Sequence, residues 1–116
     1  MSEIVIYGIK NCDTMKKALK YCDEKGVSYH FHDYKKESPD ATILQKAITE
    51  HGWEQVINKR GTTWRKLPDD VKDNVTNENA VALAMENPSM IKRPLLLKGA
   101  SIILGFSPDI YDALLD

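Results

Sequence analysis

The chain has 116 residues, of which 42% are hydrophobic and 28% charged. A chain of this length and composition can bury one core without disulfides or a structural metal, so we expect a single domain over residues 1–116. The net charge of −1 gives no basic excess of the kind that drives binding to a phosphate backbone, which argues against nucleic acid as a partner.

The cellular compartment is predicted from apolar runs and cysteines. No stretch has membrane-spanning length, and the N-terminal MSEIVIYGIK has too short an apolar run for a signal peptide. We therefore expect a cytoplasmic protein with no membrane partner. Two cysteines in such a chain are expected to be free thiols, because that compartment keeps thiols reduced.

The first elements predict a βαβ unit. Residues 3–7 (EIVIY) are a short β-branched run that ends at Gly8 and predicts a buried strand. From Cys12 to Gly26, which can end a helix, apolar residues follow helical spacing: Met15, Ala18, Leu19 and Cys22. Residues 27–34 (VSYHFHDY) alternate and predict a second strand, parallel to the first through a right-handed crossover.

A block of helices is predicted next. Ser38, Pro39 and Asp40 form a helix start with proline in the first turn, and an apolar stripe continues to about Gly52. The remaining stretches predict a short helix at 53–57, an exposed loop at 58–66, a helical turn at 68–73 and a helix at 77–87. In that last helix Ala80, Val81, Ala84 and Met85 form a stripe that we interpret as core packing.

The C-terminal third returns to strands. Ile91 and residues 94–97 predict a strand, Lys98 and Gly99 a tight turn, and residues 100–104 its antiparallel partner. Ser107 and Pro108 begin a last helix with an apolar stripe of Ile110, Tyr111, Leu114 and Leu115. This order predicts an α/β, thioredoxin-like fold: a four-stranded mixed sheet, β-α-β then β-β-α, with a helical insertion at about 38–88 between the halves.

Cys12 stands where the first helix is predicted to begin. A helix N-terminus carries partial positive charge and unpaired N–H groups, which favour the reactive thiolate. Lys10, Lys16 and Lys17 add positive charge nearby, which Asp13 partly offsets. The Thr14 hydroxyl can donate a hydrogen bond to the sulfur or simply satisfy the first turn of the helix. Spacing alone leaves two interpretations open: Cys12 is a nucleophile, or it is a small half-buried loop residue beside a solvated helix face.

Cys22 lies on the apolar stripe and is interpreted as a core residue. On one helix, ten residues at about 1.5 Å each separate the two cysteines by roughly 15 Å, whereas a disulfide needs Cα atoms within about 7 Å. Met15 also occupies the position of the second cysteine of a C-x-x-C motif. If Cys12 does redox chemistry, its resolving thiol must therefore come from outside the chain, most simply from glutathione or a glutaredoxin-like partner.

The chain has three arginines, and these can collect around an anion because a guanidinium holds oxyanions with two donors. Arg60 and Arg65 lie in the predicted exposed loop, where they can equally be ordinary loop charges. Arg93 directly precedes Pro94 at a strand start, where a cis bond would turn the backbone toward the helix start.

The three histidines raise the question of a metal site. His30 and His32 share one face of the second predicted strand, but with His51 they form no four-ligand set. We therefore interpret the strand histidines as solvent-facing and expect no metal.

Four segments together resemble the arsenate reductase (ArsC) family, most closely its YffB branch, to which Spx regulators are related. They are YGIKNCDTMKKA (7–18), NKRGTTWRKL (58–67), IKRPLLL (91–97) and LGFSPDIYDALL (104–115). The resemblance implies a thioredoxin-like fold with a helical insertion. It also implies that Cys12 is the nucleophile, that Arg60 and Arg93 bind an oxyanion, and that Pro94 is a cis-proline. We place Lys10, Asn11 and Thr14 in the same anion-binding site.

One position departs from the family pattern. Phe106 stands where arsenate reductases of the family have a third arginine, which puts arsenate in doubt as the substrate. The leading hypothesis is a glutathione-dependent thiol reductase that acts on a mixed disulfide or related oxidised substrate, either a small molecule or a protein thiol. It needs no bound cofactor, uses glutathione as co-substrate, and can engage glutaredoxin. The alternatives are a glutaredoxin-coupled arsenate reductase and, in another class, a Spx-like protein-binding regulator, against which Met15 argues.

Overall fold

The computed structural model describes residues 3–115, without the side chain of Leu115. The chain forms two compact units. The sheet unit comprises Met1–Glu37 and Arg93–Asp116, and the helical unit comprises Ser38–Lys92. The helical unit covers the stretch predicted as an insertion at about 38–88; that the two units make one domain stays a prediction. No helix within residues 3–115 combines the length and apolar character needed to cross a membrane.

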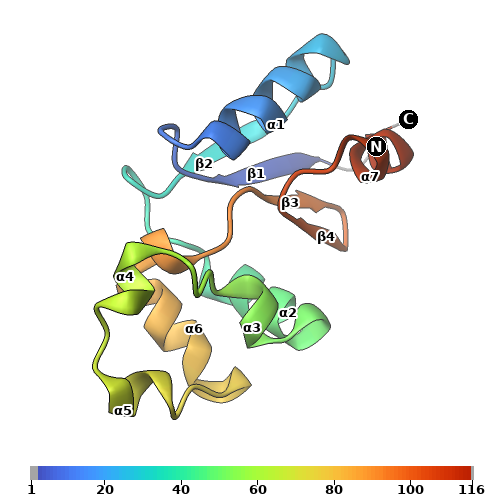
Figure 1. The fold of residues 1–116 in the computed structure, drawn as a ribbon. Helices are drawn as coiled ribbons and strands as arrows, with labels where there is room; N and C mark the ends of the chain where they lie inside the picture. The colour runs from blue at the N-terminus through green and yellow to red at the C-terminus, as the bar shows by residue number, and fades with distance from the viewer. Residues whose placement is uncertain (1–2, 116) are drawn as a thin grey trace. The chain divides into compact units, whose positions relative to one another are not determined.

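The sheet unit holds four strands in the order β2-β1-β3-β4 (Figure 1). The strands are β1 (Ile4–Gly8), β2 (His30–Asp33), β3 (Leu95–Lys98) and β4 (Ser101–Leu104). β1 pairs in parallel with β2 and antiparallel with β3, and β3 pairs antiparallel with β4. This mixed sheet confirms the predicted α/β, thioredoxin-like fold.

Strand β2 is shorter than the predicted 27–34, because the first residues of that range still follow the end of α1 (Asp13–Glu24) and are not paired in the sheet. Gly26 has a φ of 70°, a conformation that favours glycine. The N–H of Val27 then donates to the Cys22 carbonyl at 3.0 Å, which ties this residue to the helix rather than to the sheet.

Two helices, α1 (Asp13–Glu24) and α7 (Pro108–Leu115), cover the same face of the sheet. The buried residues between them and the strands form one cluster of Ile4, Ile6, Met15, Ala18, Cys22, Leu96 and Tyr111. Ile110, predicted on the buried stripe of α7, is instead 49% exposed. Successive side chains of a helix point in different directions, and here it is the Tyr111 side chain that faces the sheet. Leu115, predicted on the same stripe, has a side chain outside the described part.

The start of α1 lies directly over the end of β1. A Cβ atom added to Gly8 would meet the Met15 sulfur at 2.5 Å and its methyl group at 2.8 Å. Met15 is fully buried, so its side chain has no solvent to move into. The absence of a side chain at Gly8 therefore lets α1 approach the strand closely enough for Met15 to join the core.

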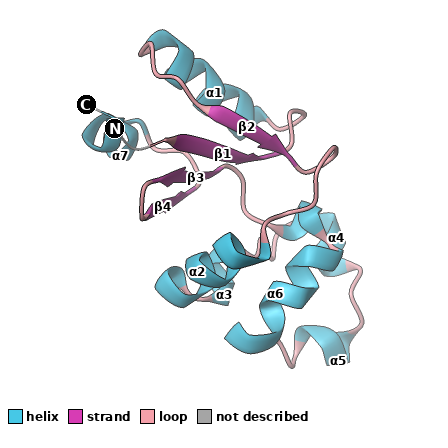
Figure 2. Cartoon of the chain, turned by 180° about the vertical axis from the view of Figure 1, so that it is seen from behind, coloured by secondary structure: helices cyan, strands magenta, loops and turns pink. Residues whose placement is uncertain are grey.

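The helical unit consists of short helices (Figure 2). They are α2 (Ala41–His51), α3 (Trp53–Val56), α4 (Thr62–Arg65), α5 (Asp69–Lys72), α6 (Asn77–Glu86) and the 3₁₀ helix η1 (Pro88–Met90). Asp40 caps α2 by accepting from Thr42 and Ile43, so Pro39 precedes the cap rather than lying in the first turn. α2 packs on α6, where buried Ala80 and Ala84 allow close approach, as predicted for that stripe.

Two further predictions for this unit are wrong. The stretch 58–66, predicted as an exposed loop, contains α4, and its Trp64 is only 9% exposed and stacks on Trp53 at 5.9 Å. A four-residue helix is too short to give a periodic signal, so burial of one indole side chain decides the structure here. Ile91, predicted in a strand, forms only an isolated bridge with Ile57.

We expect Gly8→Ala to lower the free energy of unfolding by about 1–3 kcal/mol, because the new methyl group overpacks the buried contact with Met15. Urea denaturation measures the change. Gly61→Ala is the matched control: the nearest atom to its added Cβ lies at 3.5 Å, an ordinary contact, and we expect a loss of less than about 1 kcal/mol. Equal stability of Gly8→Ala and the unsubstituted protein would contradict the close approach.

Candidate active site at the start of α1

Cys12 is the N-cap residue of α1, with extended backbone angles of φ −137° and ψ 128°. Cys12 is only partly exposed to solvent. The loop that carries it leaves the carboxyl end of β1, where Tyr7 is paired with His32 on one side and with Leu95 on the other. Because β3 runs antiparallel to β1, the chain enters β3 at this same edge of the sheet, bringing Arg93 and Pro94 to the start of α1.

The Cys12 sulfur is surrounded by donors from two segments. The Arg93 side chain hydrogen-bonds to it from the segment before β3. The backbone N–H groups of Thr14 and Met15 lie close enough to stabilise the thiolate, although the thiol makes no cap hydrogen bond of normal geometry. The sulfur thus has the helix N-terminus on one side and a guanidinium on the other.

The pKa of the Cys12 thiol is lowered from its ordinary value. Burial raises this pKa, but the N–H of Met15, the hydrogen bond and charge of Arg93, and the N–H of Thr14 together outweigh the burial. More of the thiol is therefore ionised at neutral pH than in a free cysteine, and the thiolate is the nucleophilic form.

Cys22 has the opposite environment. It is fully buried, and burial, with a smaller contribution from the charge of Asp23, raises its pKa. Both cysteines are free thiols, as predicted. Met15, at the position where a C-x-x-C motif has its second cysteine, is fully buried in the core. Among the described residues, α1 therefore offers no second thiol next to Cys12.

The Arg93–Pro94 peptide bond is cis, as the resemblance implies. The Pro94 carbonyl accepts the Gly105 N–H at 2.8 Å, so the residues after β4 lie beside the proline. Phe106 follows, and its ring packs edge-on against Tyr21 at 5.6 Å and Tyr111 at 5.0 Å. At the position of the expected third arginine, the sheet unit thus has an aromatic ring packed against its core.

The remaining predicted site residues are placed as follows. Lys10 and Asn11 are exposed on the loop before Cys12. Thr14 is exposed and contributes its backbone N–H to the sulfur. Arg60 belongs to the helical unit, where it is exposed and its N–H donates to the Asn58 side-chain oxygen at 3.1 Å. Its role beside Cys12 stays a prediction.

The strand histidines differ from each other. His30 is exposed, as predicted. The prediction is wrong for His32, whose side chain is only 17% exposed. Its ring lies 4.9 Å from that of Tyr7 and 5.9 Å from that of Tyr34, and these two rings cover part of the imidazole. Residues 3–115 contain no group of three or more His, Cys, Asp or Glu side chains able to hold a metal ion.

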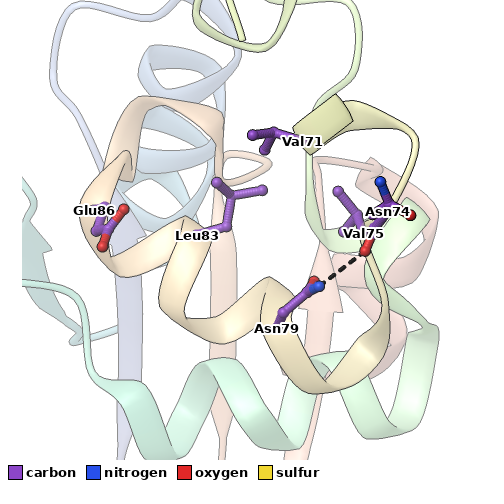
Figure 3. A pocket seen from close by; sticks show the side chains of 6 residues that line it. All are labelled: Val71, Asn74, Val75, Asn79, Leu83 and Glu86. Atoms are coloured by element: carbon purple, nitrogen blue, oxygen red, sulfur yellow. Dashed lines mark hydrogen bonds between the residues drawn. The ribbon is translucent and has the colours of Figure 1, made fainter. Parts of the chain in front are cut away.

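The helical unit contains a pocket of about 270 Å³ (Figure 3). Its lining consists of Val71, Asn74, Val75, Asn79, Leu83 and Glu86. The two asparagine amides are engaged locally, since Asn74 donates to the Asp70 carbonyl and Asn79 to the Asn74 carbonyl. The pocket lining includes no nucleophile, so the candidate active site is the one at Cys12.

The family assignment covers almost the whole chain. Residues 7–114 match the model of the ArsC family, a span that includes Cys12, Arg60, Arg93 and Phe106. The chain belongs to the ArsC family.

Three similar proteins have different descriptions. The structure of a protein named YffB is 48% identical, with a TM-score of 0.94, covering 97% of this chain and 99% of that one. An arsenate reductase (ArsC) related protein from Brucella melitensis is 47% identical, with a TM-score of 0.73, covering 98% and 95%. The global transcriptional regulator Spx of Streptococcus agalactiae is 27% identical, over 91% of this chain and 78% of that protein.

Sequence reasoning missed part of the sulfur's surroundings. Thr14 was expected to act through its hydroxyl, whereas its backbone N–H and that of Met15 stabilise the thiolate. For Met15 the sequence predicts a place on the apolar stripe and the absence of a second cysteine, but not a hydrogen-bond donor. The predicted helix start at Cys12 was itself the signal for these donors, because the first N–H groups of a helix have no partner within it.

We expect the alkylation rate of Cys12 by iodoacetamide to rise with pH and level off below the pH at which a free cysteine does, since the thiol pKa is lowered. Arg93→Gln removes the positive charge and one donor, so the profile shifts to higher pH and the rate at neutral pH falls. Arg65→Gln, at the exposed end of α4, is the control and should leave the profile unchanged. Identical profiles for Arg93→Gln and the unsubstituted protein would contradict the role of Arg93.

Proposed function

We propose that the protein is a glutathione-dependent thiol reductase with Cys12 as its nucleophile. The observation that carries the proposal is the partly exposed Cys12 sulfur, whose pKa is lowered by the start of α1 and by Arg93. Membership of the ArsC family and similarity to the YffB structure support an oxidoreductase built around this cysteine. We place the reaction in the cytoplasm, where glutathione is abundant and reduced.

The reaction has two exchange steps. The Cys12 thiolate attacks one sulfur of a mixed disulfide between glutathione and a substrate thiol, forming a Cys12–glutathione disulfide and releasing the substrate as a thiolate, which takes up a proton. A second glutathione thiolate then attacks the glutathione sulfur of this intermediate. Cys12 leaves as a thiolate and oxidised glutathione is released. The second thiol comes from outside because Met15, not a cysteine, follows in the first turn.

The other predicted site residues have supporting roles in this proposal. Arg93 stabilises the Cys12 thiolate and, with Arg60, binds the carboxylates of glutathione, for which a guanidinium is suited. Lys10, Asn11, Thr14 and Pro94 shape the anion site around the sulfur. No bound cofactor is needed, because thiol–disulfide exchange moves the electrons between sulfur atoms directly. A glutaredoxin can replace the second glutathione as the resolving thiol.

We expect Cys12→Ser to abolish reduction of a glutathione mixed disulfide, because a serine hydroxyl does not ionise at neutral pH. Cys22→Ala should retain most of the activity, since Cys22 is buried away from solvent. Mass spectrometry after treatment with oxidised glutathione provides a second measurement: one glutathione adduct on Cys12, removed by reduced glutathione. Comparable losses of activity in both variants, or an adduct on Cys22, would refute the assignment.

Arsenate reduction is the second candidate. The related protein from Brucella melitensis is described as related to an arsenate reductase, and the same Cys12 and Arg93 would serve a small oxyanion. Phe106 argues against it, because its ring packs with Tyr21 and Tyr111 and offers no donor to an anion. We expect turnover of a glutathione mixed disulfide to exceed that of arsenate, measured side by side with glutathione and glutaredoxin present; the reverse order would favour arsenate.

A regulator without turnover is the alternative from another class, because Spx proteins are relatives of this chain. It predicts a stoichiometric protein partner and no reaction of Cys12 with disulfides. The lowered pKa of Cys12 favours the enzyme, since a binding surface alone does not require an ionised thiol.

A further inference from the structure

Five exposed lysines lie on three segments at the edge of the sheet unit that carries Cys12. Lys10 lies on the loop after β1, Lys16 and Lys17 on the first turns of α1, and Lys35 and Lys36 on the turn after β2. Because β1 and β2 are parallel, the loop and the turn leave the same edge of the sheet, the edge that carries the start of α1. We call these five residues the lysine rim.

No residue of the lysine rim forms an ion pair with the side chains that the structure describes. Lysines elsewhere in the sheet unit are engaged: Lys20 with Glu24 at 3.9 Å and Lys25 with Asp112 at 2.6 Å. The rim lysines thus have no ion-pair partner among the described side chains, while the lysines toward the other end of α1 are paired.

Three acidic residues near the rim, Asp13, Asp33 and Glu37, offset part of its charge. Asp33 is buried and accepts the Lys35 N–H at 3.0 Å. Glu37 faces His32, with its oxygen 3.8 Å from Nδ1. Asp13 in the first turn of α1 is exposed and remains as the one acidic group on the helix start itself. Five lysines and Arg93 outnumber these three carboxylates, so this edge keeps an excess of positive charge and a positive potential.

We propose that the lysine rim selects the substrate of the Cys12 thiolate, and that this substrate is a thiol carried by an acidic polypeptide segment. The lysines come from three separate segments at the sheet edge that carries Cys12, so they match several carboxylates spread around a cysteine rather than one compact anion. Such charges speed encounter with a partner of opposite sign and slow encounter with one of the same sign. The inference rests on the proposed function and names its substrate class among protein thiols.

The exchange step is unchanged in its chemistry. The Cys12 thiolate attacks the glutathione sulfur of the acidic protein's mixed disulfide, the sulfur–sulfur bond breaks, and the protein thiolate leaves to be protonated. The rim takes no part in bond making. It raises the local concentration of the acidic segment, so its effect is on the second-order rate constant and is weakened by salt.

The test uses three synthetic peptides that differ only in charge: one cysteine flanked on each side by two glutamates, two glutamines or two lysines. Each is activated as a 2-thiopyridyl disulfide, which reacts with any accessible thiolate and releases coloured thiopyridone. At low ionic strength we expect the glutamate peptide to react about tenfold faster than the glutamine peptide, with the lysine peptide slowest. At high salt the three rates should converge.

Charge reversals locate the effect. Lys36→Glu should reduce the preference for the glutamate peptide severalfold, whereas Lys20→Glu, with the same change in net charge but outside the rim, should leave most of it. Lys17→Glu tests the helix segment, with the glutamine peptide reporting any change in the thiolate itself. Equal rates for the three peptides at low salt, or equal effects of Lys36→Glu and Lys20→Glu, would overturn the proposal.

The glutathione assay separates this inference from the proposed function. Turnover of the glutathione mixed disulfide without any charge preference among the peptides would support the reductase function and refute the role of the lysine rim in substrate selection. A charge preference without glutathione turnover would support substrate selection by the lysine rim and refute the reductase function, because the activated peptides require only a reactive thiolate.

Discussion

The site depends on the contact between the end of β1 and the start of α1. Gly8 has no side chain, and Met15 fills the space above it with its sulfur and methyl group. This contact sets how closely the helix start can approach the sheet edge, and so where Cys12 stands relative to Arg93. We expect a larger residue at Gly8 to push the first turn of α1 away from the strand and so move the sulfur away from Arg93.

Two opposing effects act on the Cys12 sulfur, and their balance gives the site its chemistry. Burial disfavours the thiolate, whereas the N–H groups of α1 and the guanidinium of Arg93 favour it. The cis peptide bond between Arg93 and Pro94 joins this cation to the start of β3. The nucleophile and its counter-charge thus come from different segments, and only the pairing of β1 with β3 brings them together.

The sequence predicts the features that depend on local pattern. The strand and helix order, the helix start at Cys12 and the burial of Cys22 follow from β-branched runs and helical spacing, and the structure confirms them. The features that it did not predict depend on single tertiary contacts: Trp64 stacks on Trp53 and turns an expected loop into α4. His32 is likewise covered by Tyr7 and Tyr34, which no spacing rule reveals. The position of Arg60 relative to Cys12 depends on how distant segments of the chain are arranged, which local sequence patterns do not predict.

Met15 has a kinetic consequence if Cys12 reacts as proposed. A dithiol site closes its own disulfide within one molecule, so its oxidised intermediate is short-lived whatever the surroundings. Here the position of a second active-site cysteine is occupied by Met15, whose thioether is buried. The only other cysteine, Cys22, is on the same helix and is buried in the core of the sheet unit. The lifetime of the oxidised intermediate is therefore inversely proportional to the concentration of the external thiol. The fraction of molecules in the oxidised form becomes a measure of how much reduced thiol the surrounding solution contains.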